Sequence, residues 1–143
     1  MRQYCVAKLL VIQSVNDTVS EGLRLENEIA PYLRDGLLVD ITVVRECMTG
    51  LEQLNYALYD VIIVYNHLDY ITGEEFVRIL RTLQDYTPVL FVTDSKQKFD
   101  HKSYAHEHGF SSILLKPLNP DLLVNEILHV MNTQQSEIIS ESW

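Results

Sequence analysis

The chain has few of the residues that mark unusual classes of protein. In 143 residues it holds two cysteines, five glycines and four prolines. Two cysteines cannot build a disulfide scaffold, so we expect Cys5 and Cys47 to be reduced thiols of a cytoplasmic protein. No apolar run approaches the roughly 20 residues that cross a bilayer, and we find no signal-peptide pattern before the first cysteine. We therefore expect no membrane partner.

Basic side chains are also scarce. Eleven Lys and Arg stand against 20 Asp and Glu, which gives a formal net charge of −9. Such a chain repels phosphate backbones and anionic lipids, so we expect no nucleic-acid partner. Its apolar share of 47% is that of a globular protein with a buried core. We place one domain at residues 1–131 and treat 132–143 as a C-terminal tail or a helix extension.

Short apolar runs alternate with helical patterns along the chain. The apolar runs predict strands at residues 8–12, 38–44, 61–65, 88–93 and 112–115. Capping-box patterns predict helix starts at residues 18–21, 49–52 and 72–75. A polar helix is expected to end at Gly109, and a last helix to begin at Asn119 and Pro120.

Five strands alternating with five helices predict an α/β fold, a parallel sheet covered on both faces. We expect the order 2-1-3-4-5 of a flavodoxin-like (βα)5 domain, because right-handed crossovers leave few topologies. The ligand crevice of such a sheet lies at the carboxyl ends of strands one and three. The sequence places Gln13, Ser14 and Tyr65 there, and Thr93 and Lys116 beside them.

Three stretches of the sequence resemble one known family. They are residues 59–64 with the following Thr72-Gly73, residues 88–93, and residues 109–117, which end in Lys-Pro. In order and position they look like the acceptor strand and loop, the hydroxyl-bearing strand and the fifth strand of a response-regulator receiver domain (CheY-like). The similarity covers residues 8–131. It implies a module of two-component signalling or a phosphorelay, and not an enzyme.

The phosphorylation pocket of that family needs two acids after strand one, an aspartate after strand three, a hydroxyl and a lysine. Here Gln13 and Ser14 stand at the acidic pair and Tyr65 at the acceptor, while Thr93 and Lys116 keep the expected types. Because magnesium is usually held through carboxylates, we expect no Mg²⁺ binding. Because a phenol with a pKa of about 10 is protonated at neutral pH, we expect no aspartyl-type phosphorylation. The resemblance thus predicts a degenerate pseudo-receiver.

The residues that read phosphorylation in the family also differ. Ile113 stands where the family has a switching aromatic residue, and Asp94 where it favours a small side chain. We interpret Asp94 as a cap of the fourth helix or a partner of Lys116. The Lys116 ammonium needs partners when partly buried, and we expect it to bond to Thr93, Tyr65 or a nearby carbonyl.

The leading interpretation is a phosphorylation-independent protein–protein interaction module. The usual contact face of the family is built from helix four, strand five and helix five, and here it would include Tyr104, His108, Ile113 and parts of the segment from Asn119 onward. A sensor kinase or another regulator is the expected partner, and a homodimer through the same face is an alternative. Two other interpretations stay open: phosphorylation of a displaced acid such as Asp69, and a flavodoxin-like small-molecule site. We expect no catalytic, cofactor-binding or metal-binding residues.

Overall fold

The computed structural model of the chain describes residues 5–13, 37–65, 71–94, 100–116 and 119–141. The strands are β1 (Cys5–Ile12), β2 (Leu37–Val44), β3 (Val61–Tyr65), β4 (Val89–Asp94) and β5 (Ser112–Lys116). The helices are α2 (Cys47–Tyr56), α3 (Gly73–Thr82), α4 (His101–His108) and α5 (Pro120–Glu141). The helix expected after residues 18–21 lies outside the described residues.

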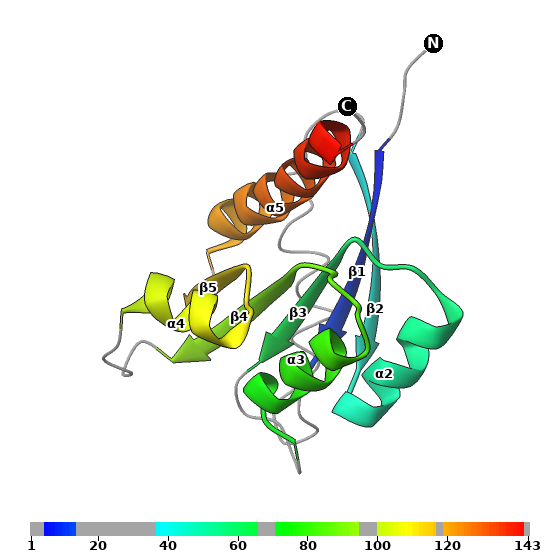
Figure 1. The fold of residues 1–143 in the computed structure, drawn as a ribbon, viewed down its shortest axis with the longest axis vertical. Helices are drawn as coiled ribbons and strands as arrows, with labels where there is room; N and C mark the ends of the chain where they lie inside the picture. The colour runs from blue at the N-terminus through cyan, green and yellow to red at the C-terminus, as the bar shows by residue number, and fades with distance from the viewer. Residues whose placement is uncertain (1–4, 14–36, 66–70, 95–99, 117–118, 142–143) are drawn as a thin grey trace.

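The strands form one parallel sheet in the order β2-β1-β3-β4-β5, which confirms the expected fold class. Strands buried on both faces are apolar throughout, and every residue of β3 is buried. The register places Leu10 beside Ile62 and Ile63 beside Leu90. Because all strands run the same way, their carboxyl ends meet at one edge, the lower end of the sheet in Figure 1.

Successive strand residues point to opposite faces and form two apolar clusters. On one face, Leu9 and Ile63 belong to a cluster that α5 completes with Leu123 and Ile127. The cluster on the other face is built from the following strand and helix residues: Leu10, Ile62, Phe91, Cys47 of α2, Phe76 of α3 and Ala105 of α4. The sheet is therefore covered by α5 on one side and by α2, α3 and α4 on the other.

Two of the expected helix starts are confirmed. The Thr72 hydroxyl accepts a hydrogen bond from the Glu75 amide at 3.1 Å, and Asn119 Oδ1 accepts one from the Asp121 amide at 3.0 Å. The start expected at residues 49–52 is wrong, because α2 already begins at Cys47 without a side-chain cap. Gly50 lies inside α2, where a β-carbon would lie 2.7 Å from Ile12 Cδ1, so the glycine permits close packing of the helix against the sheet.

The α5 helix continues to Glu141, past residue 131, where we expect the domain to end. The domain boundary itself remains a prediction. Within the described part of the chain, no helix has the length and apolar character needed to cross a membrane. Cys47 is a free thiol, and burial raises its pKa to about 12. The Cys5 side chain lies outside what the structure describes.

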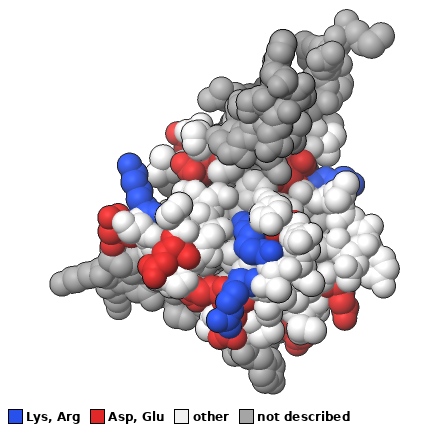
Figure 2. Space-filling model, viewed as in Figure 1, with Lys and Arg blue, Asp and Glu red and all other residues white. Residues whose placement is uncertain are grey.

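Arg81 holds two connections of the fold together from the last turn of α3. Its guanidinium donates to the carbonyl oxygens of Asp85, Thr87 and Gly109 at 2.9 to 3.0 Å. Burial lowers the pKa of Arg81, and backbone oxygens replace the water that this cation loses. On the face seen in Figure 2, side chains of both charges gather over α3 and α4, whereas the surface over α2 is mostly uncharged.

Candidate functional site

The carboxyl edge of the sheet brings together four of the five expected pocket positions. Gln13 directly follows β1, Tyr65 ends β3, Thr93 lies near the end of β4, and Lys116 ends β5. The fifth position, Ser14, lies outside the described residues. The topology therefore gathers these positions at one edge, as expected for parallel strands.

Tyr65, at the expected acceptor position, is part of the hydrophobic core. Its side chain is 1% exposed and lies in the cluster on the α5 side of the sheet. Its neighbour in the register, Val92 of β4, belongs to the same cluster. The ring thus fills apolar space between the sheet and α5, where an aspartate of the same position would leave a charge in the core.

Gln13, at the position expected for the first acid, is fully buried. Its backbone amide donates to the Val44 carbonyl at 3.1 Å and extends the β1–β2 ladder by one residue. Within the part of the chain that the structure describes, neither Nε2 nor Oε1 of its side chain has a hydrogen-bond partner. Buried polar groups are nearly always paired, and an unpaired one costs about 1–3 kcal/mol. The Gln13 amide is therefore the most costly polar group among the described residues of this edge.

Thr93 is also fully buried, and Lys116 lies beside Asp94 in the β4–β5 register. The side chains of Lys116 and Asp94 are outside the described set, so the expected bonds of the Lys116 ammonium remain a prediction. The cap of α4 is Asp100, whose Oδ1 accepts from the Lys102 amide at 3.2 Å. The interpretation of Asp94 as that cap is wrong, because α4 begins only at His101.

Tyr104, a residue of the expected contact face, contacts Glu74 and His108. Its hydroxyl donates to Glu74 Oε1 of α3 at 2.6 Å, and its ring lies 4.2 Å from the ring of His108. Burial and this hydrogen bond raise the pKa of Tyr104 to about 12. Ile113 and Tyr104 both pack against the cluster on the α2–α4 side. The structure thus brings the three predicted face residues to one region.

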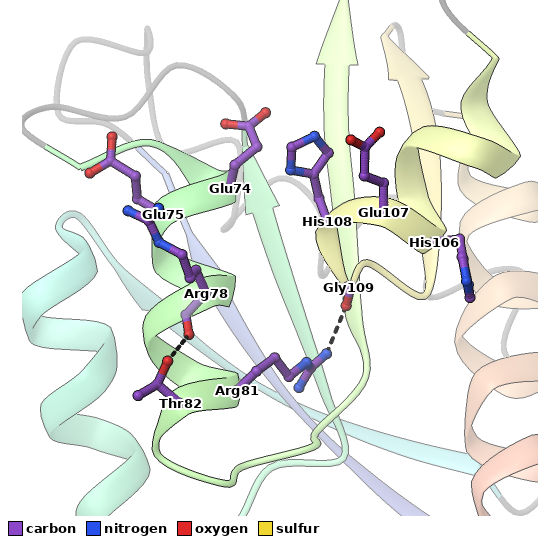
Figure 3. A pocket seen from close by; sticks show the side chains of 9 residues that line it. All are labelled: Glu74, Glu75, Arg78, Arg81, Thr82, His106, Glu107, His108 and Gly109. Carbon is purple, nitrogen blue, oxygen red and sulfur yellow. Dashed lines mark hydrogen bonds between the residues drawn. The ribbon is translucent and has the colours of Figure 1, made fainter.

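A groove of about 560 Å³ runs between α3 and α4 next to Tyr104. Figure 3 shows its lining, with Arg81 of α3 reaching across to the Gly109 carbonyl. The lining residues are mostly charged or polar: Glu74, Glu75, Arg78, Arg81, Thr82, His106, Glu107, His108 and Gly109. In the described part of the chain, no three His, Cys, Asp or Glu side chains are placed to hold a metal ion.

The sequence did not reveal the role of Glu74 in this region. The residue looks like an ordinary acid in the first turn of α3, where a negative charge favours the helix dipole. Its contact with Tyr104 joins residues 30 positions apart. Only a sequence signal that links distant positions would have predicted this contact.

The model of the response regulator receiver domain matches residues 24–128 of the chain. This match covers more than half of the sequence, and the chain belongs to this family. It is therefore a receiver domain of a two-component signalling protein. A search of the curated proteins found no match.

Solved receiver domains share the fold at low sequence identity. The signal receiver domain of a putative LuxO repressor protein from Vibrio parahaemolyticus has a TM-score of 0.78 at 18% identity, over 96% of this chain and 98% of the other. The chemotaxis response regulator CheY4 of Vibrio cholerae has a TM-score of 0.70 at 25% identity, over 88% and 99%. The receiver domain of sensor histidine kinase PA1611 from Pseudomonas aeruginosa was solved with magnesium in its active-site cleft. It has a TM-score of 0.70 at 14% identity, over 90% of this chain and 99% of the other.

Proposed function

We propose that this receiver domain acts without aspartyl phosphorylation, as a protein–protein interaction module of a cytoplasmic signalling pathway. The observation that carries the proposal is the burial of Tyr65 in the apolar cluster beneath α5. A buried phenol keeps its proton at neutral pH and is a poor nucleophile. The acceptor position therefore contributes to the core and not to phosphoryl transfer.

The donor set at the carboxyl edge supports the same proposal. Gln13, Tyr65 and Thr93, the pocket side chains that the structure describes, are all uncharged. Magnesium dehydrates reluctantly and is usually bound through carboxylates or phosphates. The receiver domain of PA1611 was solved with this ion in its cleft, but the described side chains of the present chain do not fit it. We therefore derive no phosphoryl-transfer step for this pocket.

The proposed contact face lies on α4 and β5, around Tyr104, His108 and Ile113. The hydrogen bond from Tyr104 to Glu74 anchors α4 to α3, so the face is ordered before a partner arrives. A sensor kinase or another regulator is the proposed partner.

Backbone amide spectra of the full chain test the proposal directly. They are recorded with magnesium alone and then with magnesium and beryllofluoride, a mimic of the phosphoryl group. We expect no saturable shifts around Tyr65 and Thr93, because no carboxylate receives the mimic. The receiver domain of PA1611, which was solved with magnesium in its cleft, is the positive control and should respond under the same conditions.

Saturable shifts in the unmodified chain would overturn the proposal. If Asp69→Asn then abolished these shifts, the chain would be a receiver that is phosphorylated at that displaced acid. The Asp69→Asn variant therefore separates the proposal from its main rival.

A further inference from the structure

Large apolar side chains are exposed at the amino edge of the sheet, opposite to the pocket. Tyr56 and Leu58 lie where α2 gives way to β3, and they are 86% and 89% exposed. Leu83 and Tyr86 lie in the connection from α3 to β4, and they are 66% and 70% exposed. We call these four residues the amino-edge patch. They are half of the eight large apolar side chains that are exposed among the described residues, so the exposure is concentrated here.

The patch surrounds a hollow of about 450 Å³. Leu58, Leu83 and Tyr86 line it, together with Leu54 and Tyr59, which pack against the core on the α2–α4 side. Among the described residues of the lining, the only charged side chain is that of Asp85. Figure 2 shows the surface over α2 as mostly uncharged, with acidic side chains at its lower border and a basic side chain at its upper border. Gln84, Asp85 and Thr87 also line the hollow, so it combines apolar side chains with hydrogen-bonding groups, as many binding pockets do.

Backbone bonds hold the patch in place. The α3 helix ends with hydrogen bonds from the Gln84 amide to the Arg81 carbonyl and from the Asp85 amide to the Leu80 carbonyl. This ending puts Gln84 in the left-handed region, at a φ of 62°, where a residue other than glycine is uncommon. Asp85 Oδ1 accepts from the Thr87 amide at 3.0 Å. The connection is therefore fixed, and ligand binding needs little ordering of it.

We propose that the amino-edge patch binds a short segment of another protein, which inserts one or two large apolar side chains and has basic residues beside them. The size of the patch favours a short segment as its ligand. Its four side chains present an accessible surface area on the order of 500 Å². A standard interface buries about 800 Å² on each partner, so the patch is smaller than a stable dimer needs.

The net charge of the chain also favours a basic segment as the ligand of the patch. Two copies of a chain with a formal net charge of −9 repel each other, whereas a basic segment is attracted to it. The charged group among the described lining residues of the hollow is also a carboxylate, Asp85. Arg81, in the last turn of α3, already gives its guanidinium to three carbonyls. This inference goes beyond the proposed function, because it does not depend on the pocket or on the face around Tyr104.

A displayed library of random peptides, selected against the full chain, provides the probe. We expect enriched peptides with large apolar residues next to Lys or Arg, and amide shifts on their binding that centre on Leu58, Leu83 and Tyr86. Leu58→Ser and Leu83→Ser should each weaken binding at least about tenfold, as expected for anchor contacts. Both residues are largely exposed, so these variants should fold normally, which thermal unfolding checks.

Leu122→Ser is the matched control, because Leu122 is a 58% exposed leucine of α5, outside the patch. It should leave peptide binding unchanged. The proposal is overturned if no peptide is enriched, if the shifts centre elsewhere, or if Leu122→Ser weakens binding as much as Leu58→Ser. It is also overturned if sedimentation shows a dimer that Leu58→Ser dissociates, because the occupant would then be a second copy. A response to beryllofluoride would refute the proposed function and leave this inference untouched.

Discussion

The two ends of the strands are built in opposite ways. At the carboxyl edge, polar side chains are buried: Gln13 and Thr93 are 0% exposed and Tyr65 is 1% exposed. At the amino edge, apolar side chains are exposed, and Leu58 is 89% accessible to solvent. In open parallel sheets, ligands usually bind at the carboxyl edge. Here the described side chains of that edge are uncharged and buried, whereas those of the proposed amino-edge patch are exposed.

Replacement of buried Tyr65 by alanine should have the largest effect. We expect Tyr65→Ala to lower the free energy of unfolding by about 3–5 kcal/mol, because it empties a ring-sized space beneath α5. Tyr56→Ala, at an 86% exposed tyrosine of the amino edge, should change it by less than about 0.5 kcal/mol. Urea unfolding of both variants measures the difference. Equal losses would contradict the contrast between the two edges.

The next largest effect concerns the unpaired amide of Gln13. Gln13→Met keeps the volume and removes both polar atoms, so we expect the free energy of unfolding to rise by about 1–3 kcal/mol. Thr93→Val is the matched control at the same edge. Thr93 is equally buried but has an interaction partner, so the loss of its hydroxyl should destabilise the chain. A less stable Gln13→Met variant would show that the amide is paired in solution.

Tyr104→Phe should have a smaller effect that depends on pH. At neutral pH we expect a loss of at most about 1 kcal/mol, because the pair with Glu74 is partly solvated. The folded phenol keeps its proton up to its raised pKa of about 12, while the unfolded phenol loses it near about 10. The stabilisation is therefore complete below about pH 10 and disappears as pH rises to about 12.

Chemical unfolding at a series of pH values measures the difference between Tyr104→Phe and the unmodified chain. Tyr56→Phe, at a largely exposed tyrosine, should follow the unmodified chain over the whole range. A difference that grew above pH 10 would have the wrong sign and would contradict the hydrogen bond to Glu74.

The smallest effect is expected at the helix ends. Gln84→Gly should raise the free energy of unfolding by about 0.5–1 kcal/mol, because glycine adopts a φ of 62° without steric cost. Gly109→Ala is the converse change at the end of α4. Gly109 has a φ of 82°, and a β-carbon there would lie 3.3 Å from Val77 Cγ1, so this variant should be less stable. The unfolding midpoints of both variants, compared with that of the unmodified chain, measure these two changes in stability. A destabilised Gln84→Gly would show that the glutamine side chain supports the amino-edge patch.

Local sequence was a good guide wherever a residue's role depends on its chain neighbours. The five apolar runs predicted five strands, and the hydroxyl of Thr72 and the amide of Asn119 predicted the starts of α3 and α5. The expectation failed at Thr49, where a capping pattern lies inside α2. There a β-carbon at Gly50 would lie 2.7 Å from Ile12 Cδ1, a close approach between residues far apart in the chain that the local pattern does not reveal.

By itself, the sequence determined the fold class and which residues end the strands at the carboxyl edge. Strands buried on both faces must be apolar, and parallel strands must end at one edge, so Gln13, Tyr65 and Thr93 had to meet there. Only the tertiary structure decided that the Tyr65 ring packs beneath α5 and that Leu58 and Leu83 remain in solvent. The reason is physical: composition and spacing fix which residues are apolar, but burial depends on which surfaces the folded chain brings together.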